Sequence, residues 1–243
     1  MHHVEPATTS TAPVIIDLTD VDAPPVAWPV PPPVPPPPDP LAGRRAYVWA
    51  KRVIDLTGAL VLIVLVLPLA VAAAGAVKLS SPGPVLFAHD RLGLGGRRIR
   101  CWKFRTMVDG RSGAPEGSLG ETFADRYKLD DDPRVTPVGR VLRRLSLDEL
   151  PQLLNVIGGS MSLIGPRPIV VPEAVAKWGR LYPRLAQVKP GLSGLWQVSG
   201  RSTLDYDERI RLDLTYVERC SLRLDLWLLA RTVPALVLMR GAT

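Results

Sequence analysis

The sequence predicts an α+β fold that is mainly α-helical. It comprises a re-entrant membrane helix hairpin and a small cytosol-facing domain with interfacial amphipathic helices. Three observations lead to this prediction. An uncharged run over 56–77 is long enough for a membrane helix. A segment over 99–107 alternates apolar and basic residues, as a strand does. Residues 222–239 are rich in leucine but carry charges, which suits a helix that lies along a membrane or packs on the domain.

Composition divides the 243 residues into three parts: a disordered acidic proline-rich tail (1–43), a basic lead with the membrane helix (44–79) and a domain large enough to hold an active site (80–243). The tail holds 13 of the 26 prolines, and we expect it to be extended, serving as a spacer rather than as a ligand for a proline-recognising partner. The rest of the chain carries 30 basic and 18 acidic side chains. Such a charge favours anionic partners, namely phosphates, nucleic acid or an acidic membrane surface.

The uncharged run extends from Leu56 to Val77, and as a helix it would be about 33 Å long, enough to cross the hydrocarbon core. Pro68 removes a backbone hydrogen bond near its middle and predicts a break. Basic residues flank both ends of the run, and basic flanks mark the cytoplasmic side. A helix broken at Pro68 that enters and returns is therefore favoured over a single span.

Cysteine and histidine usage excludes a common class of metal site. Cys101 and Cys220 lie far apart and match no metal-ligand spacing, so both are expected to be reduced thiols. His89 is the one histidine outside the N-terminal tail. Zinc is therefore not expected. The glycines after His89 also lack the spacing of a dinucleotide-binding loop, and a hairpin turn is the simpler interpretation.

Two adjacent carboxylates, Asp148 and Glu149, stand where a helix begins, directly after two arginines. With Ser146 as the N-cap, Glu149 closes a capping box but Pro151 falls inside the helix. With Asp148 as the N-cap, Pro151 falls in the first turn, and this register is preferred. In both registers the helix dipole favours ionised carboxylates. Such a carboxylate among cations is a candidate nucleophile or metal ligand, although acidic residues also begin helices for structural reasons alone.

Several residues are candidates for phosphate binding. Lys103 and Arg105 lie two positions apart in the predicted strand and would share one face, which is either a phosphate site or simply solvated. Arg167 stands between two prolines that fix its backbone, and a fixed guanidinium suits bidentate phosphate recognition. The full set is Lys103, Arg105, Arg143, Pro166, Arg167 and Arg201.

The order of these motifs resembles that of the bacterial sugar transferases, which are monotopic polyprenyl-phosphate phosphoglycosyl transferases. The resemblance extends from Lys51 to Thr232. One difference lies in the membrane helix, where the family often has a serine before the proline and this chain has Leu67. The matching segments are Ser-Pro-Gly-Pro-Val (81–85), Trp-Lys-Phe-Arg-Thr-Met (102–107), residues 146–155, Met-Ser-Leu-Ile-Gly-Pro-Arg-Pro (161–168) and residues 190–201.

The resemblance implies a reaction in two steps. Asp148 attacks the β-phosphate of a UDP-sugar, UMP leaves, and undecaprenyl phosphate then takes the phosphosugar from the carboxylate. Glu149 matches the second carboxylate of the family, and Mg²⁺ is the implied cofactor, with Asp148 and Glu149 as its ligands. Such a reaction initiates the synthesis of an exopolysaccharide, O-antigen or other glycoconjugate.

The resemblance also implies a location and partners. The protein is expected at the bacterial inner (cytoplasmic) membrane, with the catalytic domain (80–243) facing the cytoplasm and Pro68 at the break of the re-entrant helix. Its expected partners are a UDP-sugar, undecaprenyl phosphate and membrane lipid. A homo-oligomer stays open, and no segment indicates which sugar is transferred.

Two other functions compete with this interpretation. A non-catalytic membrane scaffold of a polysaccharide assembly complex would use the tail and the hairpin for docking, and Asp148→Asn would leave its function intact. A nucleic-acid binder is suggested by charge alone, and nucleic acid is not expected as a partner because the sequence shows no recognition module.

Overall fold

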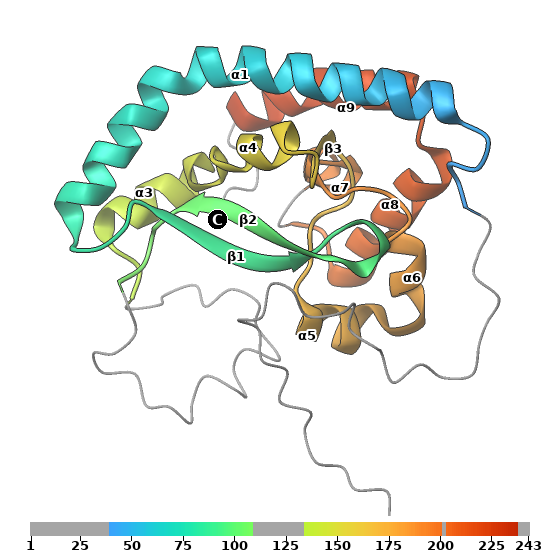
Figure 1. The fold of residues 1–243 in the computed structure, drawn as a ribbon. Coiled ribbons are helices and arrows are strands. Elements are labelled where there is room, and N and C mark those ends of the chain that lie inside the picture. Colours follow the sequence, from blue (N-terminus) through green and yellow to red (C-terminus); the bar gives the residue numbers. More distant parts are fainter. Residues whose placement is uncertain (1–38, 109–133, 201–202, 238–243) are drawn as a thin grey trace, which may run out of the picture.

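The computed structural model of the chain describes residues 39–108, 134–200 and 203–237, so most of the predicted tail (1–43) lies outside the described residues. The described part is mainly helical with two small sheets, which confirms the predicted α+β class (Figure 1). The elements, with 3₁₀ and π turns labelled η, are α1 (Arg45–Ser80), β1 (Leu86–Leu92), η1 (Leu94–Gly96), β2 (Arg98–Phe104), α3 (Pro137–Arg144), η2 (Leu147–Glu149), α4 (Gln152–Ile157), β3 (Ser162–Ile164), α5 (Val171–Glu173), η3 (Ala174–Trp178), η4 (Gly179–Leu181), α6 (Tyr182–Leu185), β4 (Gly191–Ser193), α7 (Leu195–Ser199), α8 (Tyr206–Arg219) and α9 (Leu222–Val237).

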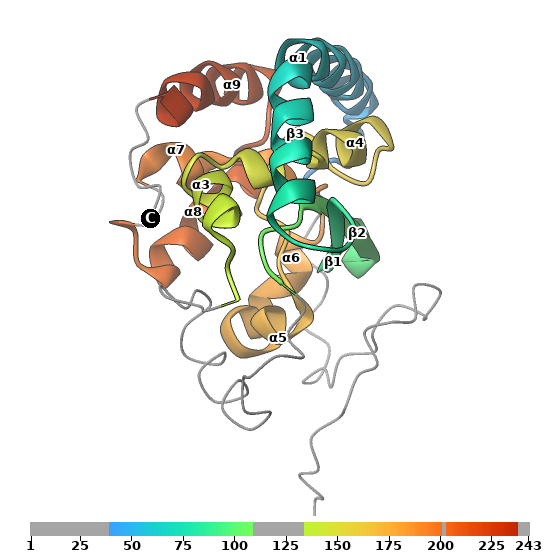
Figure 2. The same cartoon turned by 90° about the vertical axis from the view of Figure 1, so that its left-hand side faces the viewer.

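Helix α1 is a single 36-residue helix that contains Pro68. The sequence predicts a break at this residue, but α1 is one continuous helix. It crosses above the domain and bends, so that its second half turns down along one side (Figures 1 and 2). A proline removes one backbone bond and its ring pushes away the preceding turn, which is enough to bend a helix without ending it. The two helices expected of a hairpin are therefore one bent helix.

Both halves of α1 are fastened to the same domain. Near its start, Arg52 donates to the carbonyls of Val156 and Ile157 at 2.6 and 2.7 Å, at the end of α4. These carbonyls lack partners within the short helix, so the guanidinium satisfies them. Near its end, Ala73 and Val77 are buried in a cluster with side chains of β2 and α3. The domain therefore lies under the arch that α1 makes.

The middle of α1 has its apolar side chains on the outside. Val64 and Leu65 are 71% and 69% exposed, and their large apolar neighbours on the outer face are exposed as well. Within the described residues, α1 is the one helix that is long and apolar enough to cross a membrane, and little of its apolar stretch is buried. Apolar surface of this extent is characteristic of a membrane or protein interface.

The predicted strand is confirmed as β2, which pairs antiparallel with β1 across the turn at η1. In this register Phe87 lies opposite Lys103 and His89 lies opposite Cys101. Opposite residues of an antiparallel pair point to the same side of the sheet. The hairpin therefore places Phe87, His89 and Lys103 on one face.

The second sheet consists of β3 and β4, which pair in parallel. The backbones approach closely where Gly165 follows β3 and Gly191 begins β4. A Cβ on Gly191 would lie 2.1 Å from the backbone nitrogen of Gly165. The core packs around β3, with Met161, Ile164 and Tyr216 almost fully buried. Cys101 and Cys220 are buried free thiols, as predicted.

The C-terminal part contains two successive helices, α8 and α9, as the sequence predicts. Helix α9 packs beside α1, where Tyr47 donates to Asp225 at 2.9 Å (Figures 1 and 2). Leu226 and Trp227 of α9 are exposed. Helix α9 therefore contributes to the core through one face and presents apolar side chains on another.

Candidate active site

The segment that carries Asp148 begins with a well-capped helix and a sharp turn. Thr136 caps α3 by accepting a hydrogen bond from the Gly139 N–H at 2.9 Å, and Pro137 occupies the first helical position. After α3, Ser146 adopts a left-handed conformation with φ of 56°. This conformation is uncommon outside glycine, and it turns the chain sharply into η2. Asp148 and its neighbour are thereby set at an angle to α3.

Neither helix register expected for this segment is found. Asp148 and Glu149 lie on the 3₁₀ turn η2, and Pro151 is the N-cap of α4. Ser146 makes no side-chain cap, so the capping box is absent, and Asp148 is not an N-cap. The reason is tertiary: the two carboxylates face Lys103 of β2 instead of the first N–H groups of α4.

The two carboxylates and one lysine make the central cluster of the site. Lys103 Nζ lies 2.7 Å from Glu149 Oε1 and 3.5 Å from Asp148 Oδ2. The Asp148 side chain is 12% exposed, whereas the Glu149 side chain is 44% exposed. The lysine therefore bonds the outer carboxylate most closely and leaves the inner carboxylate with bonding capacity to spare.

The pKa values of the two carboxyl groups are shifted in opposite directions. Burial raises the pKa of Asp148, and Lys103 offsets only part of that effect. Burial also acts to raise the pKa of Glu149, but Lys103, with Arg167 and Arg91, outweighs it and lowers the pKa. The pKa of Asp148 is therefore not lowered, as a helix dipole would lower it, because burial exceeds the cationic attraction. A carboxylate with a raised pKa has the more basic oxygen of the two.

Arg143 and Arg167 are close enough to the pair to affect it electrostatically. Arg143 lowers the pKa of Asp148, and its Nε donates to Thr106 Oγ1 at 2.9 Å, which orients the guanidinium. The guanidinium of Arg167 lies 5.8 Å from the centre of the Trp196 ring, within cation–π range. The structure therefore brings Lys103, Arg143 and Arg167 around one pair of carboxylates.

Pro166 holds the base of the Arg167 loop and does not itself face the cluster. It is fully buried, and its carbonyl accepts from the Gly191 N–H at 2.8 Å. On the other side of Arg167, the carbonyl of Pro168 accepts from Arg91 at 3.3 Å. These bonds fix the loop on both sides, as the paired prolines predict.

The structure does not bring the remaining candidates to the cluster. Arg105 lies just beyond the end of β2, so it does not continue the strand alternation with Lys103. Its guanidinium donates to the carbonyls of Ser81 and Pro82 at 2.7 and 2.8 Å and so fastens the end of α1. Pro68 lies in the exposed middle of α1. Arg201 lies outside the described residues.

Two residues near the cluster are not among the predicted site residues. Arg91 of β1 acts on Glu149 and holds the Pro168 carbonyl, but in the sequence it belongs to a run of basic residues around a turn. Asp213 of α8 is 2% exposed, burial raises its pKa well above the ordinary value, and the backbone N–H of Arg167 donates to it. A carboxylate between apolar helix positions is the signal that could have indicated Asp213.

The carboxylate pair suits the kind of site that Mg²⁺ uses in phosphate chemistry. Mg²⁺ is usually held by one or two carboxylates together with substrate phosphates, not by a complete protein cage. Asp148 and Glu149 provide two carboxylates side by side on η2. Among the described residues, no group of three or more histidine, cysteine, aspartate or glutamate side chains could hold a metal ion. The pair therefore fits Mg²⁺ only if the substrate completes its coordination.

Comparison with known proteins identifies the family. Residues 46–239 match the family described as bacterial sugar transferase, which is most of the chain. This chain is a bacterial sugar transferase. The family match confirms the resemblance seen in the order of the motifs, and it includes every described residue of the carboxylate and cation cluster.

This sugar transferase is similar to several named proteins. It is 41% identical to the exopolysaccharide production protein ExoY of Sinorhizobium fredii, over 79% of this chain and 88% of that protein. It is 44% identical to the UDP-glucose:undecaprenyl-phosphate glucose-1-phosphate transferase of Caulobacter vibrioides, over 77% of this chain and 69% of that protein. The undecaprenyl-phosphate galactose phosphotransferase of Salmonella typhimurium is 37% identical over 82% of this chain, which spans only 43% of that longer protein.

Proposed function

We propose that this sugar transferase moves a sugar 1-phosphate from a UDP-sugar to undecaprenyl phosphate, as the first step in making an exopolysaccharide, O-antigen or related glycoconjugate. The observation that carries this proposal is a buried Asp148 beside Lys103, surrounded by arginines, in a chain of this family. Two anionic substrates and an anionic nucleophile can meet only where surplus cations offset their repulsion. The relatives from Caulobacter vibrioides and Salmonella typhimurium are named for reactions of this kind.

In the first step, a carboxylate oxygen of Asp148 bonds to the β-phosphorus of the UDP-sugar. The bond between that phosphorus and the bridging oxygen breaks, and UMP leaves with the electron pair. In the second step, a phosphate oxygen of undecaprenyl phosphate bonds to the same phosphorus, and the Asp148 oxygen leaves. The products are UMP and undecaprenyl diphospho-sugar, and the carboxylate of Asp148 is regenerated.

The environment of Asp148 favours it over Glu149 as the nucleophile. Burial strips water from Asp148 and makes its oxygen more basic, and both effects increase nucleophilicity. Glu149 is more exposed and is engaged by Lys103 at 2.7 Å. We assign Glu149 to metal binding or proton handling, and Lys103 to orienting the pair and offsetting its charge.

Arg143 and Arg167 supply the donors for the transferring phosphates. Each guanidinium is oriented by a neighbour, Thr106 for Arg143 and the Trp196 ring for Arg167. Oriented donors stabilise the charge that develops as a phosphoryl group transfers. Mg²⁺ held by Asp148 and Glu149 would neutralise phosphate charge when bound.

The arch of α1 supports a re-entrant placement in the membrane. Both halves of this helix are fastened to one small domain, through Arg52 near its start and through Val77 near its end. A helix whose two halves hold the same domain keeps both ends on one side of a bilayer. The exposed middle of α1 would then enter the hydrocarbon, and the domain would face the cytoplasm at the inner membrane.

The first experiment is nucleotide release by the full chain in nanodiscs that contain undecaprenyl phosphate and Mg²⁺, with a panel of UDP-sugars. We expect UMP with one or more of these sugars, and its release identifies the donor and the bond that breaks. Release of UDP would mean direct glycosyl transfer and would overturn the role of Asp148. A folded protein that releases neither nucleotide would favour the scaffold, and Asp148→Asn would then leave its function intact.

A further inference from the structure

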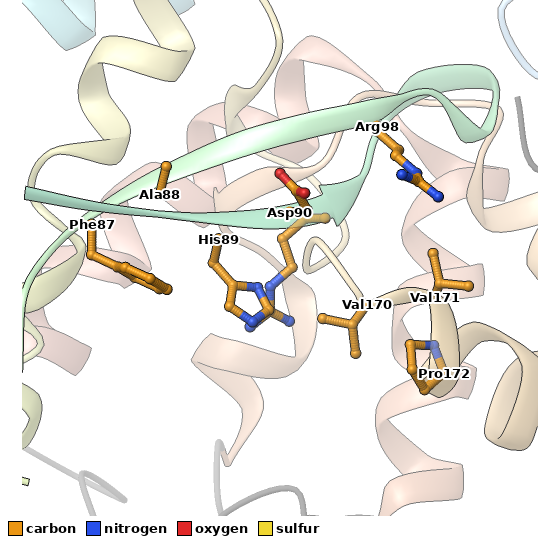
Figure 3. A pocket seen from close by; sticks show the side chains of 9 residues that line it. Phe87, Ala88, His89, Asp90, Arg98, Val170, Val171 and Pro172 are labelled. Atoms are coloured by element: carbon orange, nitrogen blue, oxygen red, sulfur yellow. The ribbon is translucent and has the colours of Figure 1, made fainter. Parts of the chain in front are cut away.

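A cavity of about 230 Å³ lies beside the proposed active site, between β1 and the segment that follows Arg167 (Figure 3). The Leu92 N–H donates to the Ile169 carbonyl at 2.8 Å, and this bridge joins the strand to that segment. As a result Val170 and Val171 face β1 across the cavity. The cavity is smaller than the roughly 300–1,000 Å³ typical of sites for whole drug-sized ligands, so it holds one ring of a larger molecule.

Two residues that line the cavity, Phe87 and Arg91, lie near the carboxylate cluster. Phe87, which lines it, lies directly opposite Lys103 in the hairpin, at a cross-strand Cβ separation of roughly 4.5–5.5 Å. Arg91 also lines the cavity, and it contributes to the lowered pKa of Glu149. A molecule that fills the cavity therefore extends, through Arg91 and Lys103, to the carboxylates.

The lining suits a flat, uncharged ring. Val170, Val171 and Pro172 make an apolar wall, and the rings of Phe87 and His89 stand with their centroids 6.1 Å apart. These two rings lie on one side of the strand, whereas the Asp90 carboxylate lies on the other side (Figure 3). Asp90, Arg91 and Arg98 also line the cavity, so its aromatic and aliphatic surface is bordered by charged residues.

His89 provides the specific polar contacts. Burial, then Arg91 and Lys103, lower the pKa of its imidazole to about 4, so the ring is neutral at pH 7. A neutral imidazole has one N–H donor and one acceptor nitrogen. The ring also has a hydrogen bond with the Asp90 backbone, which orients it. A ring with an N–H beside a carbonyl, such as uracil, offers the matching groups.

We propose that this cavity binds the pyrimidine base of the nucleotide donor, with the diphosphate extending past Arg91 to Lys103 and the β-phosphorus at Asp148. This assignment rests on the proposed function, because it takes the donor to be a uridine nucleotide. It makes Phe87, His89 and Val170 the residues that recognise the nucleotide, and it leaves the sugar on the far side of the carboxylates.

The test measures UDP binding to the full chain in detergent by calorimetry. Val170 is half-buried and lines the cavity, so Val170→Phe fills the cavity with a larger side chain. Val175 is 51% exposed and does not line the cavity, so Val175→Phe is the matched control. His89→Leu removes the ring nitrogens and keeps an apolar side chain.

We expect wild type and Val175→Phe to bind UDP alike, Val170→Phe to bind it at least tenfold more weakly, and His89→Leu to bind it several-fold more weakly. Equal binding by all four proteins would overturn the proposal, as would a wild type that does not bind UDP. Unchanged UDP binding by Val170→Phe combined with a raised KM for the UDP-sugar would place the sugar in the cavity, and it would also overturn the assignment of the base.

The two proposals fail separately. If all four proteins bind UDP equally while wild type releases UMP from a UDP-sugar, the base site is wrong and the transferase reaction stands. If Val170→Phe loses UDP binding while wild type releases no UMP with any sugar, the base site stands and the reaction is wrong.

Discussion

Two aspartates of this chain are buried beside a lysine, and they differ in how fully their oxygens are bonded. Asp225 of α9 accepts from Tyr216 Oη at 2.7 Å and from Tyr47 Oη at 2.9 Å, and it pairs with Lys51 Nζ at 3.2 Å. These three donors come from α8 and α1. The carboxylate of Asp225 therefore joins three helices and is well satisfied, as buried charges normally are.

Asp148 lacks this degree of bonding. Its ion pair with Lys103 is 3.5 Å long, and that lysine lies closer to Glu149, at 2.7 Å. A buried carboxylate with spare bonding capacity is costly for the fold but available to a substrate phosphate. The contrast indicates that Asp225 holds the structure together, and it supports the proposal that Asp148 is the nucleophile.

The largest effect is expected for the Asp148→Asn variant, in the rate of phosphosugar transfer. The amide has nearly the same shape as the carboxylate but cannot form the acyl phosphate, so we expect UMP release to fall by about 10³-fold or more. Thermal unfolding should change little, since removing a buried charge relieves its desolvation cost. Wild-type activity in this variant would show that Asp148 is not the nucleophile.

Asp225→Ala should affect stability instead of chemistry. The change leaves two tyrosine hydroxyls and Lys51 without their shared acceptor, and we expect a loss of about 3–5 kcal/mol in the free energy of unfolding. Chemical denaturation in detergent measures this loss, and UMP release per folded molecule should stay near the wild-type value. A specific loss of activity at full stability would show that the two aspartates are not distinct in role.

The same contrast applies to two arginines. Arg143 is exposed and is held by Thr106 through Nε, so its outer nitrogens can bind phosphate, whereas Arg105 is engaged by the carbonyls at the end of α1. We expect Arg143→Gln to raise the KM for the UDP-sugar about tenfold, the effect of losing one charge-assisted hydrogen bond. Arg105→Gln is the control, and it should lower the unfolding temperature with little change in KM. A raised KM in Arg105→Gln, with an unchanged KM in Arg143→Gln, would indicate that Arg105 and not Arg143 binds the phosphate.

The smallest effect concerns His89, a partly buried residue that lines the cavity. Its pKa is lowered from 6.5 to about 4 in the folded chain, so between these values the unfolded chain binds a proton that the folded chain does not. Stability should therefore fall as the pH drops from about 6.5 towards 4. Since the ring is only partly buried, we expect the contribution to be about 1 kcal/mol. In His89→Leu, this pH-dependent part of the free energy of unfolding should be absent when unfolding is measured across that pH range.

The sequence predicts the parts of the site that depend on short segments. The Asp148–Glu149 pair, Lys103 on a strand and Arg167 between prolines all follow from local patterns, and the structure brings them together. The two helices after residue 202 and the β2 strand also follow from periodicity. In each case neighbours in sequence determine the conformation.

The predictions that fail concern residues whose conformation or environment is determined by elements distant in the sequence. The turn η2 replaces the expected helix start because β2 supplies Lys103 to the carboxylates. Arg105 leaves the strand face because the end of α1 offers it carbonyls. Asp148 does not begin a helix whose dipole would lower its pKa, and burial under other elements raises that pKa. Contacts of this kind are not visible in a local pattern.

The bonds from Arg52 to the end of α4 have a geometric consequence. They fasten α1 at the C-terminal end of α4, whereas Asp148 precedes the N-terminal end of that helix. Six helical residues measure about 9 Å, so the length of α4 sets the distance between the Arg52 anchor on α1 and the proposed nucleophile. Inserting or deleting a helical turn in α4 would therefore shift Asp148 relative to α1 even if every side chain of the site were intact.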